Sequence, residues 1–94
     1  MKYFAWDPKK NEQLKKEREI SFEEVVDSIE SGKVLDIIEN PNLKKYPGQK
    51  YYIVDIADYA YIVPFVEDEE KQFLKTIFPS RKMTKKYLKK GEIK

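Results

Sequence analysis

Two runs rich in β-branched and aromatic residues, separated by only two residues, constrain the fold of this 94-residue chain most strongly. Residues 51–56 and 59–66 both have the composition of strands, and a tight turn near Ala57 and Asp58 is the only connection that fits between them. A connection of that length joins antiparallel strands. Pro64 has no backbone N–H, so we expect it at a bulge or at an outward-facing position of its strand. The centre of the chain therefore predicts a β-hairpin.

Helix signals lie on both sides of this hairpin. An Asp-Pro pair suits a helix start at residue 8, and a polar stretch continues from there to residue 19. Ser21 and Glu24 have the spacing of a capping box, and apolar residues at i, i+3, i+4 and i+7 follow, which predicts a second helix. A basic segment after residues 79–80 predicts a third helix.

Short β-rich runs at residues 2–6, 34–38 and 72–78 supply the remaining strands. The predicted order is strand, two helices, four strands and a helix. Three hairpin-like connections favour a mostly antiparallel sheet with helices packed on it. A chain of this length forms one core, so we predict a single α+β domain over residues 1–94.

Missing residue types restrict the chemistry. The chain has no cysteine and no histidine, which removes disulfides, thiolate metal sites, cysteine nucleophiles and the usual near-neutral acid–base side chain. We expect no metal and no cofactor, and we expect the acidic run at residues 67–70 to be solvated. No apolar run approaches the roughly 20 residues of a membrane span, and no signal peptide is recognisable. The expected location is therefore the cytoplasm, with no membrane partner.

The charge is unevenly distributed along the chain. Residues 80–94 carry seven lysines and arginines against one glutamate, a balance of +6, whereas the whole chain has a net charge of +2. A basic segment on a mildly acidic body indicates an anionic partner. The plainer alternative is a solvated terminal helix.

Three blocks of the sequence, taken in order and spacing, carry a resemblance to a known family. The first is F-A-W-D-P-K-K-N at residues 4–11, the second is L-K-K at 14–16 followed by I-S-F-E-E at 20–24, and the third covers residues 75–86. They resemble F-x-W-D-x-x-K-N, L-x-K-H-G-I-x-F-E-E and R-I-I-S-A-R-R-A-T-K-R-E of the BrnT-type toxins of bacterial type II toxin–antitoxin systems. The chain departs from the family at the Lys-His-Gly triplet, where residues 16–19 read K-E-R-E, and at an arginine replaced by Lys75.

This resemblance implies a RelE-like fold and a small ribonuclease that inhibits translation. It also implies two partners, RNA and a cognate antitoxin protein from the same operon. Such an enzyme cleaves RNA without a metal ion, so it needs a base for the 2′-hydroxyl, cations for the phosphate and an acid for the leaving oxygen. With histidine absent, the base is left open between Glu17, Glu19, a lysine and a tyrosine.

The candidate site residues follow from these requirements. Arg81, Lys75 and Lys82 are the candidate phosphate clamp, with Arg81 favoured because its planar guanidinium binds two phosphate oxygens at once. Glu17 completes the candidate catalytic set. The candidate RNA-binding residues are Trp6, Lys15, Lys16, Arg18, Lys85 and Lys86.

Plainer alternatives stand beside each assignment. Trp6 has the character of a core residue as much as of a base-stacking one, and the cations of the first helix suit a solvated surface. For the whole protein, the alternatives are a catalytically weak RNA-binding module on the same fold, or a protein-interaction domain that retains only antitoxin binding.

Overall fold

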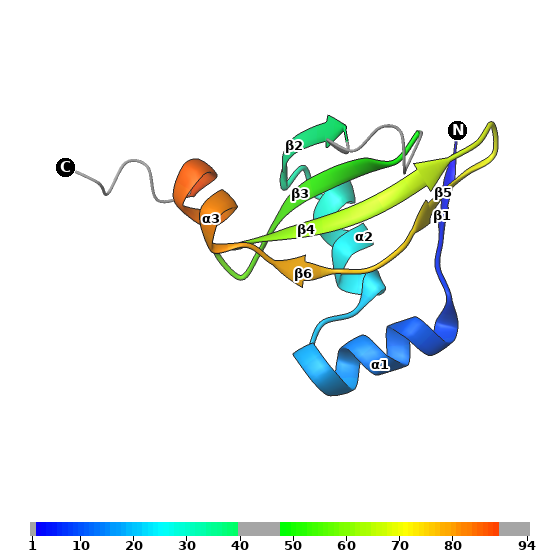
Figure 1. Ribbon diagram of the computed structural model, residues 1–94, viewed down its shortest axis with the longest axis horizontal. Helices are drawn as coiled ribbons and strands as arrows, with labels where there is room; N and C mark the ends of the chain where they lie inside the picture. Colours follow the sequence, from blue (N-terminus) through cyan, green and yellow to red (C-terminus); the bar gives the residue numbers. More distant parts are fainter. Residues whose placement is uncertain (1, 40–47, 89–94) are drawn as a thin grey trace.

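The predicted β-hairpin lies at the centre of the sheet in the computed structural model, which describes residues 2–39 and 48–88 (Figure 1). Strands β3 (Lys50–Ile56) and β4 (Tyr59–Glu67) pair in an antiparallel register that begins at Ile56 opposite Tyr59. Ala57 and Asp58 form the two-residue turn, and both have positive φ angles, 54° and 64°. Positive φ at both central positions is the pattern of a type I′ turn, whose twist matches that of the strands it joins.

The predicted last strand, residues 72–78, is wrong as a single element. The structure divides it into β5 (Lys71–Leu74) and β6 (Phe78–Pro79), both antiparallel to β4. Pro64 explains the division. Its carbonyl accepts a hydrogen bond from the Lys75 N–H at 2.8 Å, so its nitrogen faces the same neighbour and has no proton to donate. The partner strand therefore bulges at residues 75–77, between the pairs Phe65–Leu74 and Ile62–Phe78. The bulge thus lies in the partner strand and not in the strand of Pro64, and the outward-facing alternative is wrong because Pro64 is buried.

The sheet is mixed. Its strand order is β1-β5-β4-β3-β2, with β6 also beside β4. Strand β2 (Val34–Glu39) is antiparallel to β3, whereas β1 (Tyr3–Ala5) is parallel to β5. Among the described residues this is the one parallel pairing of five. The prediction of an α+β fold with a mostly antiparallel sheet is confirmed.

Helices α1 (Pro8–Arg18) and α2 (Phe22–Glu30) begin where their caps were predicted. The Asp7 carboxylate accepts a hydrogen bond from the Lys9 N–H at 3.0 Å. Ser21 and Glu24 form the reciprocal capping box. Because these caps satisfy backbone donors that a helix start leaves free, each helix begins at a defined residue.

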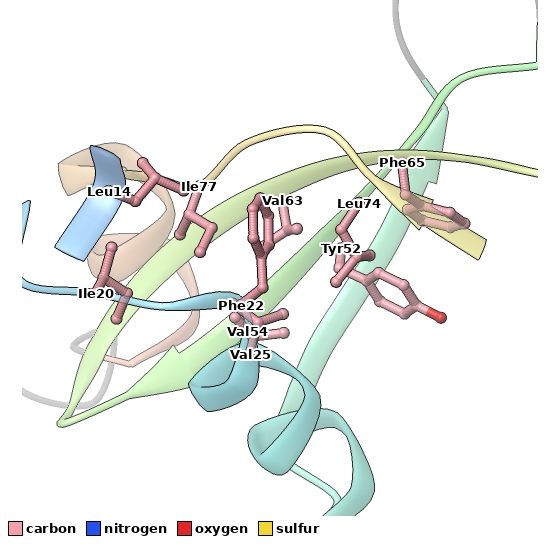
Figure 2. Packing of buried hydrophobic residues seen from close by; sticks show 10 residues of the cluster. All are labelled: Leu14, Ile20, Phe22, Val25, Tyr52, Val54, Val63, Phe65, Leu74 and Ile77. Carbon is pink, nitrogen blue, oxygen red and sulfur yellow. The ribbon is translucent and has the colours of Figure 1, made fainter. Parts of the chain in front are cut away.

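The main core lies between these two helices and one face of the sheet (Figure 2). Phe22 is fully buried at its centre, and burial of a side chain of that size stabilises the fold by roughly 1.5–3 kcal/mol. Helix α1 is almost wholly polar and contributes only Leu14 to this core. The buried residues of the cluster are Leu14, Ile20, Phe22, Val25, Tyr52, Val54, Val63, Phe65, Leu74 and Ile77.

The prediction of one core is wrong, because helices pack on both faces of the sheet and each face buries apolar side chains. A smaller core lies on the opposite face of the sheet, under helix α3 (Arg81–Tyr87). Ile53, Ala60 and Ile62 are its buried members. The side chains that pack on it from the last helical segment are Met83, Tyr87 and Leu88. No helix in the described part of the chain is long and apolar enough to cross a membrane.

Candidate nucleic-acid interface

Helix α3 is attached to the start of β4 by a buried threonine. Thr84 is 1% exposed; its Oγ1 donates to the Ser80 carbonyl at 2.8 Å and accepts from the Ala60 N–H at 2.9 Å. The Ser80 N–H in turn donates to the Ala60 carbonyl at 3.0 Å, and the Ser80 hydroxyl caps the helix by accepting from the Met83 N–H at 3.1 Å. This arrangement fixes the orientation of α3, so its outer side faces away from the sheet.

Four cations occupy the outer side of α3: Arg81, Lys82, Lys85 and Lys86, called here the α3 basic face. All four side chains are exposed. The ion pairs formed among residues 2–39 and 48–88 include none of the four. Lys86 lies 5.3 Å from the centroid of the neighbouring Tyr87 ring. The charge of Lys86 acts on the nearby Asp36 carboxylate. Because none of the four is engaged in an ion pair within the described residues, the α3 basic face presents a positive field to an anion. Lys89, Lys90 and Lys94, which extend the basic run in the sequence, lie outside the described residues.

A surface hollow of about 360 Å³ adjoins this face, lined by Tyr59, Arg81, Thr84 and Lys85. It is called here the Tyr59 hollow. Tyr59 is half-buried, and its ring meets the Tyr61 ring edge to face, with centroids 5.9 Å apart and planes at 68°. Tyr59 is not among the site residues predicted from the sequence. The available signal was its position directly after a two-residue turn, at the start of a strand.

The other end of α3 is held by Asp36, a second residue that the sequence analysis did not select. The Tyr87 hydroxyl donates to Asp36 Oδ2 at 2.5 Å, across 51 residues of sequence. This hydrogen bond lowers the pKa of Asp36, with help from the Ile37 N–H and the charge of Lys86. It also raises the pKa of Tyr87, since loss of the phenolic proton would place two negative groups together.

Arg18 and Lys75 lie near the bulge between β5 and β6. The Arg18 guanidinium donates to the Ile77 carbonyl at 2.5 Å, so it ties the end of α1 to this bulge. Lys75 is exposed, with its ammonium 5.6 Å from the centroid of the Phe73 ring. Arg18 therefore has a structural contact, whereas Lys75 leaves its charge at the surface.

The remaining candidates on α1 are exposed and do not line the Tyr59 hollow. Lys15 pairs with Glu12 at 3.3 Å. Glu17 accepts a hydrogen bond from the Gln13 side chain at 3.2 Å. Lys16 borders a separate open hollow on the outside of α1. The structure thus brings Arg81 and Lys85 together at one hollow and places Glu17 elsewhere.

Trp6 lies near the opposite end of the molecule from α3. It is half-buried, stacks on Phe22 with ring centroids 5.6 Å apart, and packs against the main core. Its outer edge borders a hollow next to β1, and Figure 1 shows β1 and α3 at the two ends of the long axis. In this position Trp6 contributes to packing and is separated from the α3 basic face.

Asn11 joins the first two sequence blocks into one structural unit. It is 4% exposed, accepts from the Phe22 N–H at 2.8 Å and donates to the Glu23 carboxylate at 2.9 Å. The bond to Asn11 is the main reason why the pKa of Glu23 lies below its ordinary value. Together with the Asp7 cap and the Trp6 stack, these contacts give much of the motif at residues 4–11 a structural role.

The acidic run after β4 is engaged in local bonds. Glu67 pairs with Lys2 at 3.0 Å and with Lys50 at 3.4 Å. Asp68 accepts from the N–H groups of Glu70 and Lys71, which with the Lys71 ammonium lowers its pKa to about 2. These carboxylates shape the hairpin tip, and the described residues contain no group of three or more acidic side chains placed to hold a metal ion.

Comparisons of the chain with protein-family models, with curated proteins and with solved structures give no match. The class of protein is therefore defined by the fold and the site alone. It is a small α+β domain whose short third helix presents exposed cations beside a hollow that Tyr59 lines.

Proposed function

We propose that this protein binds RNA through the α3 basic face. The observation that carries the proposal is the juxtaposition of exposed, unpaired cations with an aromatic ring at the Tyr59 hollow. Lysine and arginine neutralise phosphates, and an aromatic ring supplies a surface for a base. If α3 were only a solvated helix, exposed cations would be expected on it, but no adjoining hollow would be required.

The resemblance to BrnT-type toxins extends this proposal to an activity: metal-independent cleavage of RNA on a RelE-like fold. In that reaction the 2′-hydroxyl oxygen attacks the adjacent phosphorus, its proton passes to a base, and the bond from phosphorus to the 5′-oxygen breaks as that oxygen takes a proton. Arg81, assisted by Lys82 and Lys75, would stabilise the charge that develops on the phosphate. Glu17 would serve as the base.

One observation favours the second candidate, an RNA-binding protein with little or no catalysis. Among the described residues the lining of the Tyr59 hollow consists of tyrosine, arginine, threonine and lysine, without a carboxylate. Glu17, the proposed base, lies on α1 and is hydrogen-bonded to Gln13. The geometry therefore supports phosphate binding more directly than proton transfer.

Binding and cleavage are separated by two measurements on the same samples. If about four cations contact single-stranded RNA, log K should fall with log salt at a slope of roughly −3. Arg81→Ala should reduce that slope by roughly 0.7 and abolish any cleavage of RNA measured in EDTA. Because Arg81 is exposed, its loss should change the free energy of unfolding by no more than about 0.5 kcal/mol.

Lys9→Ala is the matched control, since Lys9 is an exposed cation at the start of α1. Cleavage by the wild type that Arg81→Ala removes supports the ribonuclease. RNA binding without cleavage supports the binding module. Affinity that does not change between about 50 and about 200 mM salt contradicts both.

The resemblance also supports the second proposed partner, an antitoxin protein. An acidic or amphipathic segment of that partner would neutralise the α3 basic face and cover the Tyr59 hollow, so that RNA and antitoxin compete for one surface. The remaining alternative, a domain that binds only the antitoxin, differs in having no RNA affinity of its own.

A further inference from the structure

Tyr59 occupies a position from which its ring borders both the turn between β3 and β4 and the α3 basic face. It is the first residue of β4, opposite Ile56, and it lines the hollow together with Arg81 and Lys85. Arg81 and Lys85 belong to α3, whereas Tyr59 belongs to β4. A flat apolar ring flanked by two positive charges matches the chemistry of a nucleotide, which has a flat base and a negative phosphate.

The Tyr59 ring is held in place by its surroundings. Tyr61, which contacts it edge to face, is itself packed against the main core. The preceding turn has only two residues, so β3 and the paired start of β4 fix where Tyr59 begins its strand. Because ring and helix are both anchored, the hollow exists before a ligand arrives, and binding costs little ordering entropy.

Thr84, which completes the lining, has no proton left to offer a ligand, because its hydroxyl already donates to the Ser80 carbonyl. Among the described residues, the lining therefore offers mainly an aromatic residue and charged hydrogen-bond donors. It offers few fixed neutral donors, which are the groups that would distinguish one base from another. Its volume, about 360 Å³, lies near the lower end of the roughly 300–1,000 Å³ of small-ligand pockets. One nucleotide fits that space better than a double helix.

We propose that Tyr59 is a base-stacking residue, and that the protein therefore prefers single-stranded to double-stranded RNA. An unpaired base lies on the Tyr59 ring while Arg81 and Lys85 hold the neighbouring phosphates. In a duplex both faces of each base are already stacked, so this contact is lost. The inference rests on the proposed RNA-binding function and adds to it the conformation of the ligand and a residue that selects it.

The test compares Tyr59→Leu and Tyr59→Phe with the wild type. Affinity is measured for an unstructured RNA oligonucleotide and for the same sequence in a duplex. Tyr59→Leu should weaken single-strand binding roughly 10-fold, leave the salt slope unchanged because no charge is removed, and abolish the preference for single strands. Tyr59→Phe keeps the ring and should bind as the wild type does. Tyr3→Leu, at an exposed tyrosine on β1, is the matched control and should change nothing.

A second measurement uses the unaltered protein, so it does not depend on the folding of a variant. The same oligonucleotide carrying 5-iodouridine is irradiated on the protein, and the crosslinked peptide is identified by mass spectrometry. A crosslink at Tyr59 supports stacking. A crosslink confined to other residues, or wild-type affinity in a folded Tyr59→Leu variant, overturns the stacking role and leaves RNA binding by α3 intact. If the wild type binds neither RNA, the proposed function and this inference both fail.

Discussion

Several single residues of this protein perform structural tasks that their place in a motif does not reveal. Asn11 is the clearest, because both polar atoms of its amide are used inside the protein: Oδ1 accepts from the Phe22 N–H and Nδ2 donates to Glu23. Phe22 is the fully buried centre of the main core. A residue eleven positions away in sequence thus fixes the start of α2, and with it the position of that aromatic ring.

Asn11→Ala tests this role. The substitution leaves the buried Phe22 N–H without its acceptor, and an unsatisfied buried group costs about 1–3 kcal/mol. We expect the free energy of unfolding in urea to fall by that amount. Gln13→Ala removes an exposed amide from the same helix and should change stability by no more than about 0.5 kcal/mol. Equal stability of the two variants would show that the Asn11 bonds contribute nothing net.

Among the elements, α3 depends most on contacts outside itself. Its seven described helical residues are too few for a helix that is stable alone in water. It is held at one end by the bonds of Ser80 and Thr84 to Ala60. At the other end it is held by the hydrogen bond from Tyr87 to Asp36. The α3 basic face therefore has a defined orientation only while both attachments are intact.

The pH dependence of the second attachment follows from the two pKa shifts. The pKa of Asp36 is lowered from its ordinary 3.8, so the bond stabilises the fold above that pH and its contribution is lost as pH falls through the lowered value. The pKa of Tyr87 is raised from 10.0, so the contribution is complete below pH 10 and is lost as pH rises through the raised value. The bond therefore acts between these limits.

The substitution Tyr87→Phe tests this pH dependence. The variant keeps the ring that packs on the smaller core and loses only the hydroxyl. We expect faster amide hydrogen exchange in α3 and lower stability than the wild type at neutral pH. The difference should shrink as pH falls below 3.8 and through the lowered pKa of Asp36, where its carboxylate becomes protonated. Tyr3→Phe, at the exposed tyrosine of β1, is the control. A difference that stays constant down to low pH would exclude the Asp36 bond as its cause.

In the molecule as a whole, the excess of positive charge and the third helix belong to the same region of the protein. The body carries a net negative charge, while the segment that begins with α3 carries +6. The helices of the N-terminal half cover one face of the sheet, and α3 lies on the other (Figure 1). An anionic ligand is thus attracted to one region and repelled from the rest, which raises the rate of productive encounter.

This separation leads to a prediction for the proposed antitoxin. Lys85→Glu/Lys86→Glu reverses two charges on the α3 basic face and should slow association with a co-expressed acidic partner. The association rate of the wild type should also fall as salt rises. Lys9→Glu/Lys10→Glu makes the same charge change at the start of α1 and serves as the control. Unchanged association of the α3 variant, measured by surface plasmon resonance, would place the partner on another surface.

Local sequence determined most of the elements of this protein. The Asp7 cap, the capping box at Ser21 and the two-residue turn at Ala57 and Asp58 each depend on groups within four residues of one another. Such contacts form in the same way wherever the segment lies in the fold. The bulge opposite Pro64 is different: the missing N–H is visible in the sequence, but the strand that it interrupts was predicted as one element.

Tertiary structure alone decided which distant residues meet. The parallel pairing of β1 with β5, the bond from Arg18 to Ile77, and the bond from Tyr87 to Asp36 each join segments that no local pattern connects. The same holds for the candidate site, where Tyr59 and Arg81 come together because α3 folds back on β4. The physical reason is that burial of apolar side chains, which is non-directional and acts over the whole chain, selects these neighbours, whereas caps and turns act only along the backbone.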